Sequence, residues 1–281
     1  MLIAQITDTH IQEPGGRLDR WYDTAGGLQQ AVTHLNALDP LPDLVLLTGD
    51  TVDGGSHEEY CRLKEILSEL EPPLYVIPGN HDDREQMRRH FADDGYLPAD
   101  GYLQYSIEGW PVRLVGLDTL VMGESGGLLC EKRLRWLDKT LGNFPKKPTV
   151  IFQHHPPFQT GLTRMDEMGL KNADELAQLV ARHEQVVHIV AGHLHRPITA
   201  NFSGIVTTVC PSTAHQMALD LPPNRGLSVV MEPPAASLLW WNDEMGKLVH
   251  HLSYIGNRVP HKLHNGTDWC AGDGPPEGFY D

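Results

Sequence analysis

The sequence has few cysteines, and they are spaced too widely to form a zinc ribbon or a disulfide framework. The four thiols include no C-x-x-C pair, which argues against small folds held together by disulfides or by zinc. We expect most of them to be buried or incidental, whereas Cys270, in a loop-like C-terminal segment, could pair between chains. The four are Cys61, Cys130, Cys210 and Cys270.

Positive charge and long apolar runs are also scarce. Lys and Arg number 22 against 37 Asp and Glu, which gives a formal net charge of −15. Such a surface repels duplex nucleic acid and anionic membranes. The first apolar run, Leu2 to Ile6, leads directly into polar residues, and no later run is long enough to span a bilayer. We therefore expect no nucleic acid as main partner, no membrane partner and a cytoplasmic location.

The composition that remains is typical of a folded domain. Hydrophobic residues make up 40% and charged residues 21% of the 281 residues, enough for a sizeable core. We expect one main domain over residues 1–258. The segment 259–281 is rich in Gly, Pro and His, and we expect a tail there that could form an oligomer contact.

Short apolar runs alternate with helical patterns, which is typical of a sheet covered by helices. The runs predict strands at 2–7, 44–48, 74–77, 103–107, 112–117, 149–153 and 186–190. Helical spacing predicts helices around 28–38, 60–70, 131–141 and 172–183, the second behind a Ser56-x-x-Glu59 capping box. From about 197, runs at 198–202, 205–209, 227–231, 237–241 and 248–254 predict antiparallel strands. We expect these C-terminal strands to form a second sheet packed on the first.

Polar side chains follow five of the predicted strands. A single D-x-H or G-D motif is usually an ordinary turn or helix cap. Five such strand ends in succession are harder to explain in that way, because ligands gather at the carboxyl ends of strands in α/β sheets. The spacing therefore predicts one cluster of metal ligands, comprising Asp8, His10, Asp50, Asn80, His154, His193 and His195.

The order D-x-H, G-D, G-N-H-D, H-H and G-H-x-H, from Asp8 to His195, resembles the calcineurin-like metallophosphoesterase superfamily. The resemblance implies an α+β fold, a four-layer αββα sandwich of two mixed sheets flanked by helices, with a dinuclear metal site at the strand ends. The segments 79–83 (GNHDD), 154–157 (HHPP) and 211–216 (PSTAHQ) are similar to those of class III cyclic nucleotide phosphodiesterases and related bacterial glycerophosphodiesterases.

Carried onto this sequence, the family pattern implies two sets of ligands. The first ion would be held by Asp8, His10 and His195, the second by Asn80, His154 and His193, with Asp50 bridging. Nitrogen and oxygen ligands suit two divalent ions of Mn, Fe, Zn or Co without selecting among them. The purple acid phosphatase branch has a Tyr ligand three residues after the bridging Asp. This chain has Asp53 there, so a ferric–tyrosinate centre is not expected.

The same resemblance implies hydrolysis of a small phosphodiester by a metal-bound hydroxide. His81 would be the catalytic acid that protonates the leaving group, with a purely structural role as the alternative. Substrate contacts are expected from Asn80, His81 and His215. His155 should support its neighbour and not bind metal. The loop residues Arg20, Trp21 and Tyr22 could contact the organic part of the substrate or simply pack.

Three alternatives stay open. A phosphomonoesterase or a nuclease could use the same fold, although the core motifs contain no Arg and the composition supplies no basic groove. A non-catalytic scaffold should have lost ligands or His81, and neither is lost. The sequence does not distinguish cyclic nucleotides from glycerophosphodiesters as the substrate. It also does not identify the two metals. The resemblance also suggests a dimer or larger homo-oligomer formed through the C-terminal region.

Overall fold

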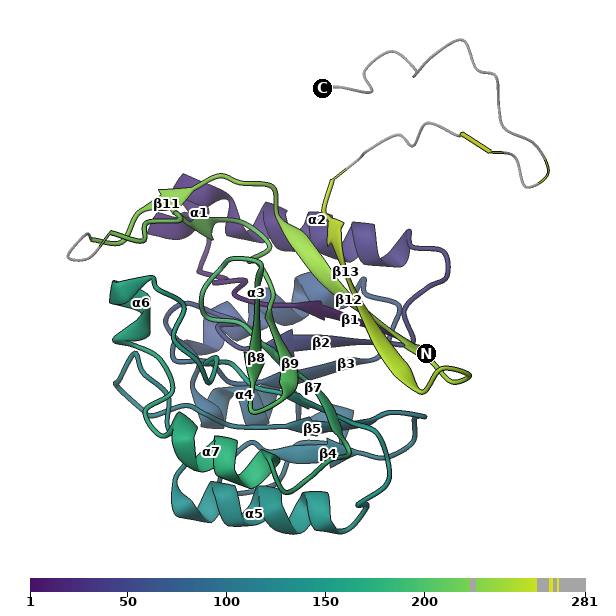
Figure 1. Ribbon diagram of the computed structural model, residues 1–281. Coiled ribbons are helices and arrows are strands. Elements are labelled where there is room, and N and C mark those ends of the chain that lie inside the picture. The colour runs from purple at the N-terminus through teal and green to yellow at the C-terminus, as the bar shows by residue number, and fades with distance from the viewer. Residues whose placement is uncertain (223–225, 257–262, 265–266, 268–281) are drawn as a thin grey trace.

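The computed structural model describes residues 1–222, 226–256, 263–264 and 267. Two β-sheets lie against each other with helices on their outer sides (Figure 1). A buried apolar cluster fills the space between the sheets, to which Ile3 and Leu46 contribute from one sheet and Val150 and Phe152 from the other. This inner cluster joins the sheets into one unit.

The first sheet has the order β13-β12-β1-β2-β3. Strands β1, β2 and β3 are parallel, whereas β12 and β13 are antiparallel to their neighbours. Alternate residues face opposite sides, so Ile3 points into the inner cluster while Ala4 and Ile6 point toward the helices. The strands are β1 (Leu2–Ile6), β2 (Leu44–Thr48), β3 (Leu74–Ile77), β12 (Ala235–Asn242) and β13 (Lys247–Tyr254).

The second sheet has the order β4-β5-β6-β7-β9-β8. Its central strands β5, β6, β7 and β9 are parallel, and the outer strands β4 and β8 run antiparallel to their neighbours. The strands are β4 (Tyr105–Ile107), β5 (Arg113–Gly116), β6 (Thr149–Phe152), β7 (Val186–Ala191), β8 (Ile198–Phe202) and β9 (Ile205–Val209).

Helices complete the outer layers. Helices α2 (Thr24–Asn36) and α3 (His57–Leu67) bury Leu28, Leu35 and Leu63 against the first sheet. Helices α5 (Glu131–Gly142) and α7 (Ala173–Val180) cover the second sheet. The predicted αββα sandwich of two mixed sheets is confirmed. The short elements are α1 (Arg17–Tyr22), α4 (Arg84–His90), the 3₁₀ turn η1 (Ala92–Asp94), α6 (Thr163–Asp166), β10 (Gln216–Met217) and β11 (Val229–Val230).

The prediction that the C-terminal strands form a separate second sheet is wrong. Strands β8 and β9 extend the sheet of β4 to β7, whereas β12 and β13 return to the first sheet. There β12 pairs with β1 in the antiparallel direction, and Leu239 lies opposite Ile3. Both residues are fully buried, so the free edge of β1 is closed by an apolar strand. Of the strand predicted at 227–231, the structure forms only the two residues of β11 (Val229–Val230).

The part of the chain that the structure describes contains no helix long and apolar enough to cross a membrane. The predicted boundary at residue 258 and the tail over 259–281 lie outside the described residues, except for 263–264 and 267. Cys270 lies outside them too. Within the described part of the chain the other three cysteines form no disulfide, with Cys61 exposed and Cys210 buried.

Candidate metal centre

The seven predicted ligands meet where parallel strands of both sheets end. Asp8 and His10 follow β1, Asp50 follows β2 and Asn80 follows β3 in the first sheet. His154 follows β6, and His193 and His195 follow β7 in the second sheet. All are buried except Asn80, which is half-buried. The sandwich therefore brings two rows of strand ends to one place, as the sequence predicted.

Three side chains form one group of ligand atoms. The Nε2 atoms of His10 and His195 lie 3.1 Å apart, and Nε2 of His195 lies 3.3 Å from Oδ1 of Asp8. These ligand atoms are close enough to one another to share a metal ion.

A second group lies on the other side of Asp50. Nε2 of His154 lies 3.2 Å from Oδ1 of Asn80, and the rings of His154 and His193 are 5.1 Å apart. Oδ2 of Asp50 lies 3.3 Å from Nε2 of His154 and 3.7 Å from Nε2 of His10. One carboxylate oxygen thus faces both groups.

The histidine rings are oriented by acceptors on their other nitrogen. Nδ1 of His154 donates to the carbonyl oxygen of Thr48 at 2.9 Å, and Nδ1 of His195 donates to that of His215 at 3.0 Å. A carbonyl can only accept, so these contacts place a proton on Nδ1 and direct Nε2 into the cluster. This is the usual arrangement of metal-binding histidines.

Two further observations fit a pair of divalent ions. Nε2 of His193 is buried and has no hydrogen-bond partner among the described residues, although buried polar atoms are normally satisfied. Five of the seven residues also have the left-handed backbone conformation, in which residues other than glycine are strained. They are Asp8 (φ 52°), His10 (φ 42°), Asp50 (φ 46°), His193 (φ 71°) and His195 (φ 45°). Metal coordination would account for both features.

Two glycines permit the close approach of the ligand loops. A Cβ atom on Gly79 would lie 2.2 Å from Oδ1 of Asp50, and one on Gly192 would lie 2.1 Å from Oγ1 of Thr7 and 2.8 Å from Oδ2 of Asp8. Neither position can carry a side chain without moving a carboxylate. The glycines of the G-N-H-D and G-H-x-H motifs are thus explained by packing at the site.

The two buried carboxylates stay ionised. Burial alone would raise the pKa of Asp50, but His154 and His81 lower it well below its usual range. The pKa of Asp8 is likewise lowered to about 2, because His195 outweighs the cost of burial. At neutral pH the cluster therefore offers two negative charges to cations.

His81 lies at the rim, with its side chain 38% exposed. Its backbone N–H donates to Oδ1 of Asp50 at 2.9 Å, and its Nδ1 lies 2.8 Å from the carbonyl oxygen of Asp53 and 3.2 Å from Oδ1 of Asp53. Burial lowers the pKa of His81, but Asp50 and Asp53 outweigh it and raise the pKa to about 10. The imidazolium form is thereby favoured, and Nε2 remains available for another partner.

Asp53 is the important residue that the sequence did not single out as part of the site. Its carboxylate contacts His10, His81 and the amide of Gln12. The signal in the sequence is its position three residues after Asp50, which by itself argues only against a tyrosinate ligand. An aspartate in a loop has no pattern of its own that distinguishes a supporting role from solvent exposure.

The remaining predicted residues lie around this centre. His215 is buried beside His195, with ring centroids 4.8 Å apart, and stacks on Tyr22 at 4.7 Å. Trp21 is exposed and lies beside Tyr22. His155 has both ring nitrogens occupied, by the hydroxyl of Thr119 at 2.8 Å and the carbonyl of Ser125 at 3.1 Å.

A family model for calcineurin-like phosphoesterases matches residues 1–197, a segment that includes all seven clustered ligands. The chain belongs to this family.

Named relatives of this calcineurin-like phosphoesterase agree with the assignment. A probable glycerophosphodiester phosphodiesterase, GpdQ, from Arcobacter nitrofigilis is 40% identical over 94% of this chain and 97% of its own length. The 3',5'-cyclic adenosine monophosphate phosphodiesterase CpdA of Escherichia coli is 30% identical over 76% of each chain. Among solved structures, a dimetal phosphatase from Danio rerio superimposes with a TM-score of 0.65 at 16% identity, covering 91% of this chain and 96% of that chain. This last likeness concerns the fold alone.

Proposed function

We propose that this chain is a metal-dependent phosphodiesterase that hydrolyses small phosphodiesters. The observation that carries the proposal is the position of Asp50, whose Oδ2 faces Nε2 of both His10 and His154. A carboxylate oxygen between two sets of nitrogen and oxygen donors is the arrangement required to bridge two ions. Relatives named as phosphodiesterases support the reaction class.

In this proposal Asp50 would be shared between two ions. The first set of ligands is Asp8, His10 and His195, and the second is Asn80, His154 and His193. Two divalent ions bound there would supply positive charge to the phosphoryl group and lower the pKa of a water molecule. The donor set suits Mn, Fe, Zn or Co. Since the second set contributes a neutral amide where the first contributes a carboxylate, we expect the second ion to bind more weakly; equal affinities in a calorimetric titration would contradict this.

His81 has the position and charge expected of the general acid. Its Nδ1 is engaged by Asp53, so a proton on Nε2 can be donated to a leaving alkoxide at the rim. General-acid help of this kind contributes about 10²–10⁴-fold to a rate. Asn80 and His81 would contact the phosphoryl group, while His215 and Tyr22 would form the wall beside the organic part of the substrate.

The charges around the centre favour a diester over a monoester. Arg84 pairs with Asp118 and Arg196 pairs with Glu232, so these cations near the motifs are already engaged. His81 contacts Asp53 through Nδ1 and keeps Nε2 for a substrate, and one such cationic donor suits the single negative charge of a diester better than the dianion of a monoester. We propose a glycerophosphodiester as the first natural substrate to test, because the GpdQ relative covers almost the whole chain.

The test is a comparison of substrates on chelated protein to which Mn²⁺, Zn²⁺, Fe²⁺ or Co²⁺ is restored. We expect metal-dependent turnover of bis(p-nitrophenyl) phosphate to exceed that of p-nitrophenyl phosphate, and a glycerophosphodiester to be a better substrate than cyclic AMP. Preference for the monoester would favour a phosphomonoesterase, and cleavage of DNA or RNA a nuclease. Absence of turnover with two ions bound would favour a scaffold.

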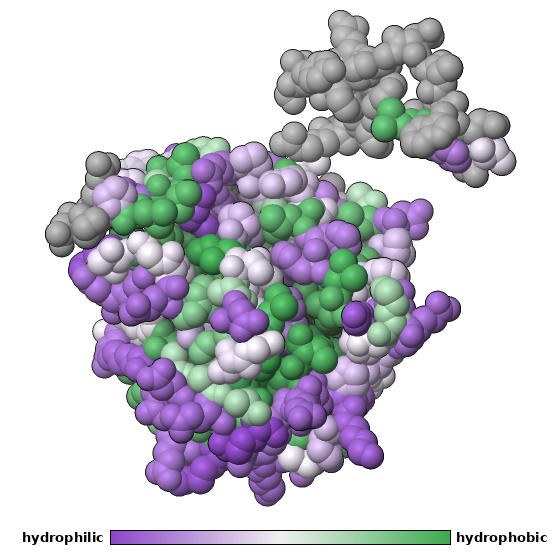
Figure 2. Space-filling view, in the orientation of Figure 1, coloured by the Kyte–Doolittle hydropathy of each residue, from purple (hydrophilic) through white to green (hydrophobic). Residues whose placement is uncertain are grey.

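We also propose that the protein assembles as a homo-oligomer. Apolar side chains gather near β10 and β11 at one end of the molecule (Figure 2). Those exposed around this two-stranded arm are Leu219, Leu221, Leu227, Val229 and Met231, and exposed apolar side chains near one another are typical of contact surfaces. Light scattering on the purified chain should give at least twice the mass of 31.3 kDa. A Leu221→Glu variant should lower it, whereas a monomeric wild-type chain would refute the proposal.

A further inference from the structure

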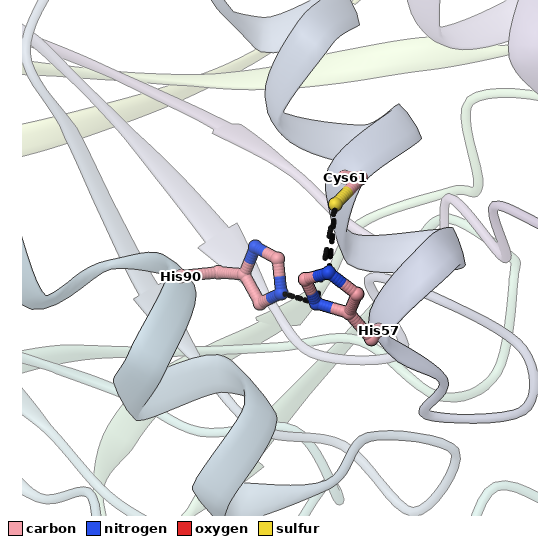
Figure 3. A group of neighbouring side chains, drawn as sticks. All are labelled: His57, Cys61 and His90. Atoms are coloured by element: carbon pink, nitrogen blue, oxygen red, sulfur yellow. Dashed lines mark hydrogen bonds between the residues drawn. The ribbon is translucent and has the colours of Figure 1, made fainter.

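A second group of metal-ligating side chains lies on the surface between α3 and α4. Sγ of Cys61 lies 3.6 Å from Nε2 and 4.0 Å from Nδ1 of His57. That Nδ1 lies 2.8 Å from Nε2 of His90. Figure 3 shows the His57 ring standing between the thiol and the His90 ring. None of the three residues belongs to the groups around Asp50.

The two helices bring these residues together for reasons of ordinary packing. His57 and Cys61 are four residues apart on α3, so their side chains lie on one face of the helix. His90 is the last residue of α4. It stacks on the buried Tyr60 with ring centroids 5.5 Å apart and an interplanar angle of 19°. The fold thus holds the third side chain opposite the other two.

We propose that His57, Cys61 and His90 form an accessory site for one soft or borderline divalent ion such as Zn²⁺, distinct from the dinuclear centre. One thiolate and two imidazoles are typical zinc ligands. His57 and Cys61 are exposed and His90 is half-buried, so the fourth position of a tetrahedral ion is open to water or to a solvent ligand.

The separations fit tetrahedral coordination after small side-chain rotations. Zn–N bonds of about 2.0–2.1 Å and Zn–S bonds of about 2.3 Å place neighbouring ligand atoms roughly 3.3–3.6 Å apart. One ion would bind one nitrogen of His57. With Nδ1 as that ligand, its 4.0 Å separation from Sγ of Cys61 must close slightly, and its 2.8 Å separation from Nε2 of His90 must open slightly.

An ion at this site would connect α3 to α4 and, through Tyr60, to the ligand loops. The Tyr60 hydroxyl donates to Oδ1 of Asp82 at 2.8 Å. Oδ2 of Asp82 in turn accepts from the backbone N–H of Gly79 at 2.8 Å and of Thr51 at 3.2 Å. These backbone groups adjoin Asn80 and Asp50. Occupancy of the accessory site should therefore raise the thermal stability of the folded chain, because an ion that binds only the folded state stabilises it.

The experiment is a Co²⁺ titration of the full chain with its thiols kept reduced, followed by absorption spectroscopy. A thiolate bound to Co²⁺ gives a ligand-to-metal charge-transfer band in the near ultraviolet. The ligands proposed for the dinuclear centre contain no sulfur, so this band reports on a thiolate site alone. We expect the wild-type chain to show the band, and Zn²⁺ to abolish it by displacement.

Matched variants assign the band to this cluster. Cys61→Ser should abolish it while metal-dependent diester hydrolysis is retained, and Cys130→Ser should leave it unchanged. His90→Gln should weaken the Co²⁺ affinity measured from the band by roughly tenfold or more. No band at saturating Co²⁺, or a band that persists in Cys61→Ser, would overturn the proposal. A band without any diester hydrolysis would count against the proposed enzyme activity only.

Discussion

Oδ1 of Asp53 lies 3.1 Å from Nδ1 of His10, which leaves Nε2 of that ring facing His195 within the cluster. The same oxygen lies 3.2 Å from Nδ1 of His81 at the rim. One carboxylate therefore orients a proposed metal ligand and the proposed acid together.

Replacing Asp53 by Asn should affect both histidines. The amide keeps the size of the side chain but removes the negative charge that favours imidazolium, so the pKa of His81 should fall from its raised value. If protonated His81 is the acid, the alkaline limb of the kcat profile should move to lower pH. Metal affinity should also drop about 10–100-fold, because His10 loses its orienting partner. The exposed Asp93→Asn should change neither property, and an unmoved alkaline limb in Asp53→Asn would contradict the role of Asp53.

Replacing His81 by Ala should separate substrates by their leaving groups. A diester with an alkoxide leaving group needs a proton, so its rate should fall by about 10²–10⁴. The nitrophenolate of bis(p-nitrophenyl) phosphate needs little protonation, so its rate should fall far less. Equal losses on both substrates, measured as kcat at matched metal occupancy, would show a structural role for His81.

A methyl group at Gly192 should disturb the metal centre. Its Cβ would lie 2.1 Å from Oγ1 of Thr7 and 2.8 Å from Oδ2 of Asp8. We expect Gly192→Ala to lower both the thermal midpoint of unfolding and metal stoichiometry, because Asp8 must move. The control is Gly142→Ala at the end of α5, where no atom of the described residues lies within 4 Å of the added atom. Normal metal content in Gly192→Ala would contradict this packing argument.

Much of this centre could be predicted because each ligand has a local signature. Asp8-x-His10 and Gly192-His193-x-His195 each follow a buried strand. Both patterns can be recognised in the sequence without knowing the fold. Long-range pairing is different. Nothing in the run around Leu239 indicates that it adds to β1 instead of extending the sheet of β4 to β9, because both edges offer equivalent backbone hydrogen bonds.

For the same reason, the sequence does not identify residues whose roles depend on tertiary contacts. Asp53 meets His10 only because the β1 and β2 loops lie side by side, joined by the pairing of Ile11 with Val52. The accessory cluster likewise depends on the packing of α4 against α3, which places His90 near Cys61. Charge and residue type alone do not distinguish such side chains from ordinary surface residues.

His188 should make stability depend on pH. It is buried on β7 with Nε2 2.9 Å from Oγ1 of Thr208, and burial, then His250, lowers its pKa to about 4. As the pH falls below about 6.5, the unfolded chain binds a proton that the folded chain does not, so stability falls until about pH 4. The loss should be on the order of 3 kcal/mol at most. The free energy of unfolding, measured by urea unfolding at a series of pH values, should depend less on pH in His188→Gln than in the wild type, whereas the exposed His251→Gln should behave as the wild type. The same pH dependence in all three proteins would contradict the assignment.

If two ions held on either side of Asp50 act as one catalytic unit, turnover should depend on both metal equivalents. Chelated protein is titrated with Mn²⁺, an ion poorly matched to the thiolate of Cys61, while bound metal and hydrolysis of bis(p-nitrophenyl) phosphate are measured together. Activity should rise mainly with the second equivalent, and Asp50→Asn should lose that rise. Full activity at one equivalent, or wild-type behaviour in Asp50→Asn, would contradict the claim.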